Sequence, residues 1–186
     1  MSDKLNTWLF RFVFICAFVL HGVFINAQAL RPTLKLAVFD VDATPPVGTQ
    51  LTYDPMLNDW DLGLRAKGVV ILGAGLPIVM CSVDWIGISN DSQDEFKRVM
   101  AEAAATIPSR VVVHAIHQHD APSSDLGAEK LMQEVGLNPI AFEGTYTRDL
   151  IKRLGLAIQK SILVAVPFTH IGKGEAPVYQ VASNRR

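Results

Sequence analysis

SNDSQDEFKRVMAEAAATIPSRVVVHAIHQHD, residues 89–120, is the stretch that decides the fold. The apolar residues that recur in it at helical intervals are Phe96, Val99, Met100, Ala103 and Ile107. They predict a helix over 89–107, which Pro108 ends. The valine-rich residues 110–116 then predict a strand that runs into a cluster of histidines. A helix that leads directly into a buried strand is typical of an α/β domain.

The rest of the chain alternates in the same way. Ser92 and Glu95 have the spacing of a capping box near the start of the first helix. Further strands are expected over residues 34–41, 67–72, 77–83, 168–172 and 177–182, and further helices over 128–135 and 143–164. The glycines within 73–76 predict a hairpin and not a dinucleotide-binding turn, because a strand follows where a helix is required. The expected fold class is α/β, with a mixed sheet and flanking helices.

The first 29 residues have the pattern of a signal peptide. Lys4 and Arg11 give a cationic start, an apolar run covers 12–25, and Ala27-Gln28-Ala29 is a small-x-small cleavage pattern. A membrane-spanning helix needs about 20 apolar residues, so the run is short for one. We expect export and cleavage after residue 29, with an uncleaved anchor as the alternative.

Charge and cysteine content exclude other classes of protein. The formal net charge is −1 and the sequence has no basic stripe, so it offers no electrostatic basis for binding nucleic acid. Cys81 is the one cysteine after the leader, which excludes an internal disulfide in the exported chain. Because it lies in an apolar stretch, Cys81 is predicted to be a small buried hydrophobic residue.

Three of the five histidines lie within residues 114–119. If the strand continues to Asp120, the side chains of His117 and His119 share one face of it. Zinc readily binds two imidazoles arranged in this way, and ligands gather at the carboxyl ends of strands in α/β sheets. The sequence therefore predicts that His117 and His119 are metal ligands. Asp120 is a candidate to orient a ligating imidazole from behind.

Other residues near the cluster leave alternatives open. His114 would lie on the opposite face of the strand and is interpreted as a hydrogen-bonded core residue, with metal binding as the alternative. His170 is either a strand residue or a third ligand. Asp84 closes a strand at the same edge of the sheet, where it either helps to form the pocket or anchors the segment that follows.

Four short motifs resemble those of a known family. Residues 41–48 (VDATPPVG), 81–84 (CSVD), 117–122 (HQHDAP) and 184–185 (NR) follow the order and spacing of motifs in the neutral, non-lysosomal ceramidases. The sequence is most similar to bacterial ceramidase-like proteins in which His-Gln-His-Asp-Ala-Pro replaces His-Thr-His-Ser-Gly-Pro. The resemblance identifies residues 30–186 as the amino-terminal portion of a larger catalytic domain.

The resemblance implies a secreted, zinc-dependent amide hydrolase that cleaves ceramide to a fatty acid and sphingosine. It implies that His117 is the first zinc ligand and that His119 is its neighbour in the site. Arg185 corresponds to an arginine near the reacting end of the substrate, where it would polarise a carbonyl or hold a polar head group. The implied partners are an N-acyl lipid substrate and, peripherally, a membrane.

The sequence also departs from the family. Asp120 replaces a serine and Ala121 replaces a glycine, and both changes alter the site. The remaining zinc ligands of the family lie beyond its Asn-Arg motif, so we expect a chain that lacks them, binds zinc weakly and is inactive alone. The competing functions are another His-x-His metallohydrolase and a non-catalytic exported binding domain whose histidines form only hydrogen bonds. Zinc stoichiometry separates the binding domain from both enzymes.

Overall fold

The structure is a computed structural model that describes residues 33–58, 62–177, 179 and 180. The helices and strands of the described residues lie within residues 34–186, one of the two units into which the chain divides. The proposed leader, residues 1–29, lies outside the described residues. Within the described ranges, no helix has both the length and the apolar character needed to cross a membrane.

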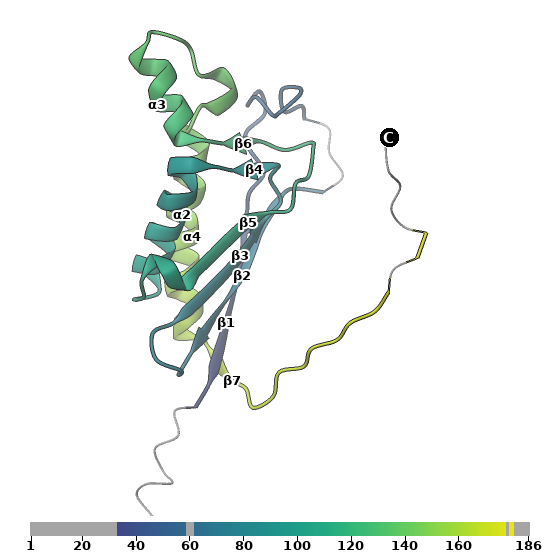
Figure 1. Ribbon diagram of the computed structural model, residues 1–186, viewed down its shortest axis with the longest axis vertical. Helices are drawn as coiled ribbons and strands as arrows, with labels where there is room; N and C mark the ends of the chain where they lie inside the picture. The colour runs from purple at the N-terminus through teal and green to yellow at the C-terminus, as the bar shows by residue number, and fades with distance from the viewer. Residues whose placement is uncertain (1–32, 59–61, 178, 181–186) are drawn as a thin grey trace, which may run out of the picture. The chain divides into compact units, whose positions relative to one another are not determined.

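A five-stranded mixed sheet forms the centre of the fold, in the order β5-β3-β2-β1-β7. Its strands are β1 (Lys35–Asp42), β2 (Arg65–Leu72), β3 (Ile78–Val83), β5 (Val111–Ala115) and β7 (Val166–Pro167). β2 pairs antiparallel with both β1 and β3, whereas β3 and β5 pair parallel. Helix α2 (Asn90–Ala103) connects the two parallel strands, so both of these strands end at the same edge of the sheet (Figure 1).

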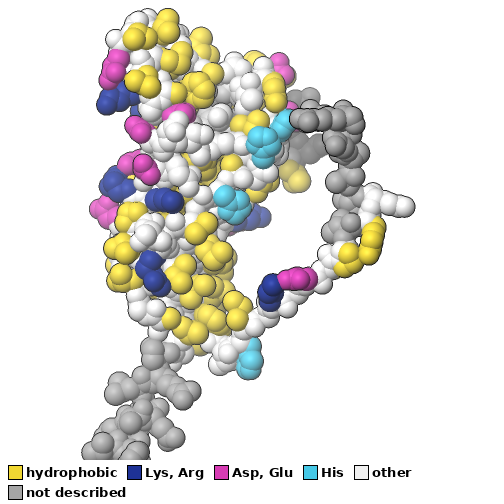
Figure 2. Space-filling model, viewed as in Figure 1, with side chains coloured by type: hydrophobic (Ala, Val, Ile, Leu, Met, Phe, Trp, Pro, Cys, Tyr) yellow, Lys and Arg dark blue, Asp and Glu magenta, His cyan; other side chains and the backbone are white. Residues whose placement is uncertain are grey.

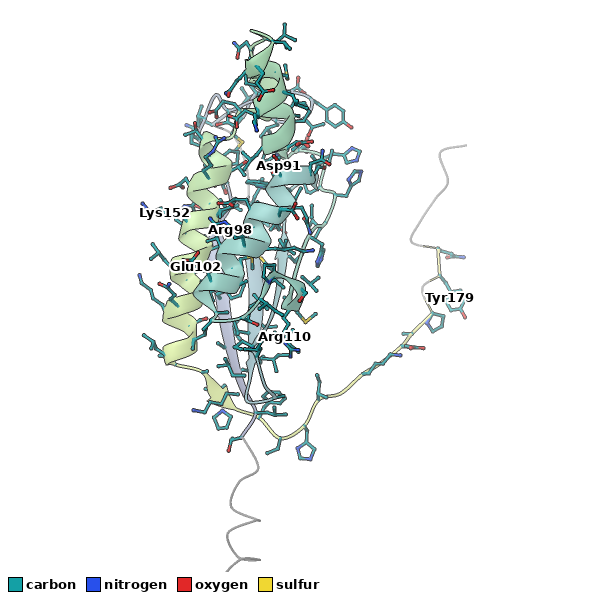
Figure 3. All side chains as sticks on the ribbon, turned by 60° about the vertical axis from the view of Figure 1, so that its left-hand side comes forward. Asp91, Arg98, Glu102, Arg110, Lys152 and Tyr179 are labelled. Atoms are coloured by element: carbon teal, nitrogen blue, oxygen red, sulfur yellow. The ribbon has the colours of Figure 1, made fainter. Side chains whose placement is uncertain are left out.

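Two helices cover one face of the sheet. α2 and α4 (Thr145–Leu163) pack against each other, and α4 also packs on β1. Gly155 of α4 permits this close approach, because a Cβ atom there would lie 3.2 Å from a methyl group of Val99. Figure 3 shows the two helices side by side, with Arg98 and Glu102 labelled on α2. The core lies between the helices and the alternate strand residues that point toward them, such as Phe39 and Val113.

The other face of the sheet carries exposed side chains. One apolar row crosses four strands in register: Val38, Val69, Met80 and Val112. Val38 is 65% exposed and Val112 is 52% exposed. Figure 2 shows hydrophobic side chains at the surface over the strands. The next row is polar and consists of Asp40, Lys67, Ser82 and His114. Arg65 (2.9 Å) and Lys67 (3.8 Å) both form ion pairs with Asp40, so the apolar row lies beside a row that carries charges of both signs.

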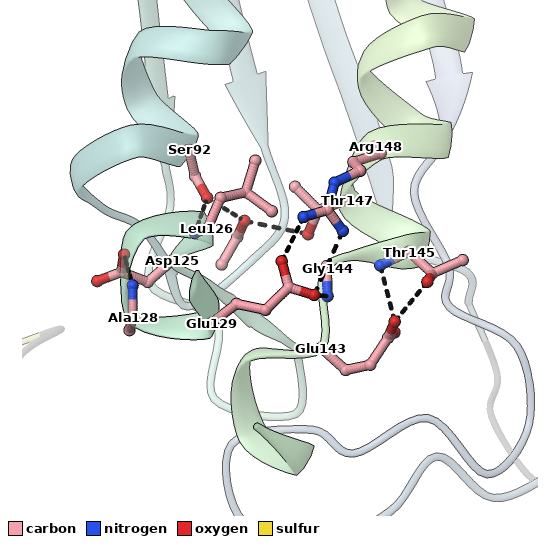
Figure 4. A network of polar contacts seen from close by, with 11 residues as sticks. Ser92, Asp125, Leu126, Ala128, Glu129, Glu143, Gly144, Thr145, Thr147 and Arg148 are labelled. Carbon is pink, nitrogen blue, oxygen red and sulfur yellow. Dashed lines mark hydrogen bonds and ion pairs between the residues drawn. The ribbon is translucent and has the colours of Figure 1, made fainter. Parts of the chain in front are cut away.

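A polar network joins the remaining elements. β4 (Gly87–Ile88) pairs parallel with β6 (Ser123–Ser124), and α3 (Leu126–Glu134) follows. The buried carboxylate of Glu129 accepts hydrogen bonds from the Gly144 N–H (2.9 Å) and from the Arg148 guanidinium (Figure 4). Burial alone would raise the pKa of Glu129, but these bonds outweigh it and lower the pKa. The network therefore holds α3 against the start of α4.

Most elements expected from the sequence are confirmed, with small changes in their bounds. The predicted capping box at Ser92 and Glu95 is wrong, because the N-cap position of α2 is Ser89 and Ser92 is buried inside the first turn. The hydroxyl of Ser92 instead accepts hydrogen bonds from the Ser124 hydroxyl and the Leu126 N–H, both at 2.8 Å.

The strand expected over 168–172 is also wrong. That segment carries no strand, and β7 precedes it with only two residue pairs to β1. Parts of the strand expected over 177–182 lie outside the described residues, and its described residues carry no strand.

Candidate functional site

The candidate site lies where β3 and β5 end side by side. Val83 pairs with Ala115 as the last residues of these parallel strands. The two loops that follow stay hydrogen-bonded, from the His117 N–H to the Trp85 carbonyl (3.1 Å) and from the Ile86 N–H to the Pro122 carbonyl (3.2 Å). Trp85 is fully buried and its indole N–H donates to the Ala43 carbonyl at 3.0 Å. Residues 116–122, which we call the histidine loop, are therefore hydrogen-bonded to a segment that contains a buried tryptophan.

His117 is held by both its backbone and its ring. Its φ is +66°, a left-handed conformation that is uncommon for residues other than glycine. Its Nδ1 lies 2.8 Å from the carbonyl oxygen of Ile86. A carbonyl oxygen can only accept, so Nδ1 carries a hydrogen, and in the neutral ring this leaves the lone pair on Nε2. A neutral imidazole fixed in this tautomer is what a metal ligand requires.

His119 lies next to His117. The two ring centroids are 5.1 Å apart and the ring planes are nearly perpendicular, at 83°. The other side of His119 faces Tyr53, whose ring centroid is 5.6 Å away and whose hydroxyl oxygen is 3.4 Å from Nδ1. Both histidines are exposed to solvent. The arrangement brings two imidazoles together at the surface, at the carboxyl edge of the sheet.

The structure corrects how the pair comes together. β5 ends at Ala115, so the expectation of a strand that continues to Asp120 is wrong. The rings approach each other because the chain turns at His117, not because alternate residues share a strand face. His114 is exposed on the open face of the sheet, and its interpretation as a core residue is therefore also wrong.

The other candidate residues have separate environments. The backbone N–H of Asp120 donates to the side-chain oxygen of Gln118. No contact among the described residues joins the Asp120 carboxylate to either imidazole. Asp84 anchors the neighbouring strand, because its carboxylate accepts the Arg65 N–H at 2.9 Å. His170 is exposed, and its Nδ1 lies 2.7 Å from the Thr169 hydroxyl. Arg185 lies outside the described residues.

A groove of about 770 Å³ runs beside the histidine loop. Its lining includes Ile116 and Gln118, which flank His117, together with Asp84 and Asp42. A hydrogen bond from the Thr44 N–H (2.9 Å) lowers the pKa of Asp42. The groove has both charged and aliphatic walls, since Leu62 and Leu64 also line it. Its lining therefore offers contacts to both polar and apolar groups.

The donor set accounts for part of a zinc site. Two neutral imidazoles suit zinc, and a catalytic zinc usually has three protein ligands and one open position. Among the described residues, no group of three or more His, Cys, Asp or Glu side chains is close enough to hold a metal ion. The residues present fit a metal as two of its ligands.

Sequence reasoning missed two partners of the pair. The Ile86 carbonyl leaves no sequence signal, because any residue supplies one. Tyr53 lies in a segment of aromatic and turn-forming residues that the sequence indicates only as an irregular surface loop. Its distance from the histidines along the chain, 66 residues to His119, hides the contact.

Comparison with known proteins gives matches at the level of structure. No protein-family model matches the chain, and no curated protein matches it in sequence. A neutral ceramidase from Pseudomonas aeruginosa matches with a TM-score of 0.52 and 18% identity. A ceramidase complexed with C2 matches with a TM-score of 0.50 and 17% identity. Each match covers 73% of this chain and 22% of the solved chain.

The expected fold class is therefore confirmed, because the chain shares its mixed α/β arrangement with part of these ceramidase structures. The chain spans about a fifth of the length of the solved chains that it matches. In its described residues, this protein has the fold of one portion of a neutral ceramidase.

Proposed function

We propose that this chain is the amino-terminal part of an exported, ceramidase-like zinc hydrolase that acts on the amide bond of N-acyl lipids. The observation that carries the proposal is the imidazole pair of His117 and His119, 5.1 Å apart at the carboxyl edge of a ceramidase-like sheet. Residues 1–29 would direct export, and the lipid substrate would bring the protein into peripheral contact with a membrane.

His117 and His119 would hold the metal through Nε2. The Nδ1 atom of each ring lies near an oxygen atom, from Ile86 for His117 and from Tyr53 for His119. A zinc ion bound there would supply an activated water and polarise the amide carbonyl. Arg185 is assigned to that carbonyl or to the polar head group. Asp120, next to His119, is assigned to receive or deliver a proton at the site.

The groove beside Ile116 and Gln118 supports a lipid-like substrate over a small polar one. Its aliphatic lining from Leu62 and Leu64 suits an acyl chain, and its charged residues suit a head group. Because the described residues supply only two imidazole ligands, we expect the isolated chain to release almost no fatty acid from N-acyl lipids.

The experiment that tests the proposal measures zinc binding by the whole 186-residue chain. Isothermal titration should show one weak site in the unmodified chain. His117→Ala and His119→Ala should each weaken it by at least about tenfold. His170→Ala is the matched control, since His170 is an exposed histidine whose Nδ1 lies beside the Thr169 hydroxyl, and this variant should bind as the unmodified chain does. Equal binding by all four proteins, or no binding by any, would contradict a metal role for the pair.

A further inference from the structure

The loop that carries Tyr53 is attached to the histidine loop by a pair of hydrogen bonds. The N–H and the hydroxyl of Thr52 both donate to the carbonyl oxygen of Ala121, at 3.2 and 3.1 Å. The same loop closes on itself through a bridge between Gln50 and Pro55. These contacts place the Tyr53 side chain beside the site.

Tyr53 contacts His119 through both its ring and its hydroxyl group. The ring centroids are 5.6 Å apart with an interplanar angle of 40°. The hydroxyl oxygen lies 3.4 Å from Nδ1 of His119, at the long end of hydrogen-bond distances. Tyr53 itself is 62% exposed, so burial of apolar surface is not its main contribution. Its defined partner is the imidazole.

The two histidines are then supported in parallel ways. Ile86 supplies an oxygen atom to Nδ1 of His117 at 2.8 Å, and Tyr53 supplies one to Nδ1 of His119. The carbonyl allows only one tautomer, whereas a hydroxyl can donate or accept. Only the tautomer with hydrogen on Nδ1 leaves Nε2 of His119 able to bind a cation beside His117.

We propose that Tyr53 is a positioning residue that accepts a hydrogen bond from Nδ1 of His119 and holds that ring with its Nε2 free for the metal. The metal-binding part of this inference rests on the proposed function, whereas the Tyr53–His119 contact itself is present without a metal. Partners of this kind fix the orientation of ligating imidazoles, and their removal typically weakens metal binding by about 10- to 100-fold.

The first measurement uses the metal-free chain. Two-bond ¹H–¹⁵N spectra in mildly alkaline buffer report which nitrogen of each neutral imidazole carries the hydrogen. We expect the Nδ1–H form for His117 and His119 in the unmodified chain. Tyr53→Phe, which keeps the ring and removes the hydroxyl, should move only His119 toward the other tautomer. An unchanged His119 signal, or an Nε2–H form in the unmodified chain, would overturn the proposal.

The matched control is Tyr179→Phe. Tyr179 is 78% exposed in the carboxyl-terminal segment and is labelled away from the helices in Figure 3. Its loss should leave both histidine spectra as they are. A change of the same size in this variant would show that the effect of Tyr53→Phe is not local, and would also overturn the proposal.

Zinc titration of the same samples separates the two ideas. Tyr53→Phe should weaken binding by about tenfold and Tyr179→Phe should not. A shifted tautomer without any zinc binding supports positioning by Tyr53 and rejects the metal site. Equal zinc binding with unchanged tautomers supports the metal site and rejects the role of Tyr53.

Discussion

The ring of His117 donates a 2.8 Å hydrogen bond to the carbonyl oxygen of Ile86, across two loops that belong to neighbouring parallel strands. This bond exists because the backbone of His117 turns into the left-handed region, with φ +66°. For residues other than glycine, that conformation costs about 1–2 kcal/mol of folding free energy, and such strain is often found at functional sites.

The first prediction concerns this strain. His117→Gly and His117→Val both remove the ring, but only glycine accepts the backbone conformation without cost. We expect the valine variant to be less stable than the glycine variant by about 1–2 kcal/mol in urea unfolding. The comparison cancels the loss of the Ile86 bond, which both variants share. Equal stabilities would show that the loop does not hold a left-handed residue.

A second prediction concerns the buried Glu129. Its pKa is lowered in the folded chain, so it stabilises the fold above its unfolded pKa of about 4.3, and this contribution is lost as the pH falls through the folded value. Glu129→Gln should cost about 1–3 kcal/mol at neutral pH, because a buried, charge-assisted contact with Arg148 is lost. The difference from the unmodified chain should shrink below pH about 4.

The control for Glu129 is Glu134→Gln on the same helix. Its carboxylate lies 4.0 Å from Lys130 and its side chain is 57% exposed, so the change should be within about 0.5 kcal/mol at every pH. Chemical unfolding at several pH values measures both variants. A pH-independent deficit in Glu129→Gln would reject the ionised form as the stabilising one.

A third prediction tests the packing of the sheet. A Cβ atom on Gly68 would clash with the ring of Phe39 and with the backbone carbonyl of Met80. The carbonyl belongs to the paired strand and cannot move aside, so Gly68→Ala should destabilise the fold by about 1–3 kcal/mol. Gly172→Ala is the control, because nothing lies within 4 Å of a Cβ atom there. Thermal unfolding of the two variants should separate them clearly, and similar transitions would contradict the pairing of β2 with β3.

A fourth prediction concerns the Cys81 thiol. The side chain is 2% exposed, and burial raises its pKa to about 12. The reactive thiolate is therefore scarce and shielded, and the folded chain should resist thiol reagents until denaturant is added. A Cys16→Ser background limits the measurement to this one thiol. Rapid labelling in native buffer would show that the strand is not packed under the helices.

The sequence predicts the helices and central strands well because their signals are local. The apolar spacing of α2, the valines of β5 and the glycines between β2 and β3 each specify one element, and the structure confirms all three. The prediction of a capping box was wrong because the Ser92 hydroxyl accepts hydrogen bonds from Ser124 and Leu126. These hydrogen bonds depend on a segment that is distant in the sequence, so local spacing could not predict them.

The candidate site was predictable only in part. The His-x-His pattern indicates the pair, but its geometry depends on the left-handed turn at His117 and on Tyr53 arriving from another loop. Neither has a local sequence signal. The assumed strand through Asp120 predicted that the imidazoles lie together for the wrong reason, because β5 ends at Ala115. The exposure of His114 was equally hard to predict, since it depends on which face of the sheet the helices cover.

The apolar row of Val38, Val69, Met80 and Val112 bears on how the chain behaves at high concentration. With a net charge of only −1, molecules repel each other weakly, and the aliphatic rows of two molecules can exclude water when they meet. We expect these aliphatic side chains to lower the solubility of the protein, so Met80→Lys should raise the concentration at which it precipitates.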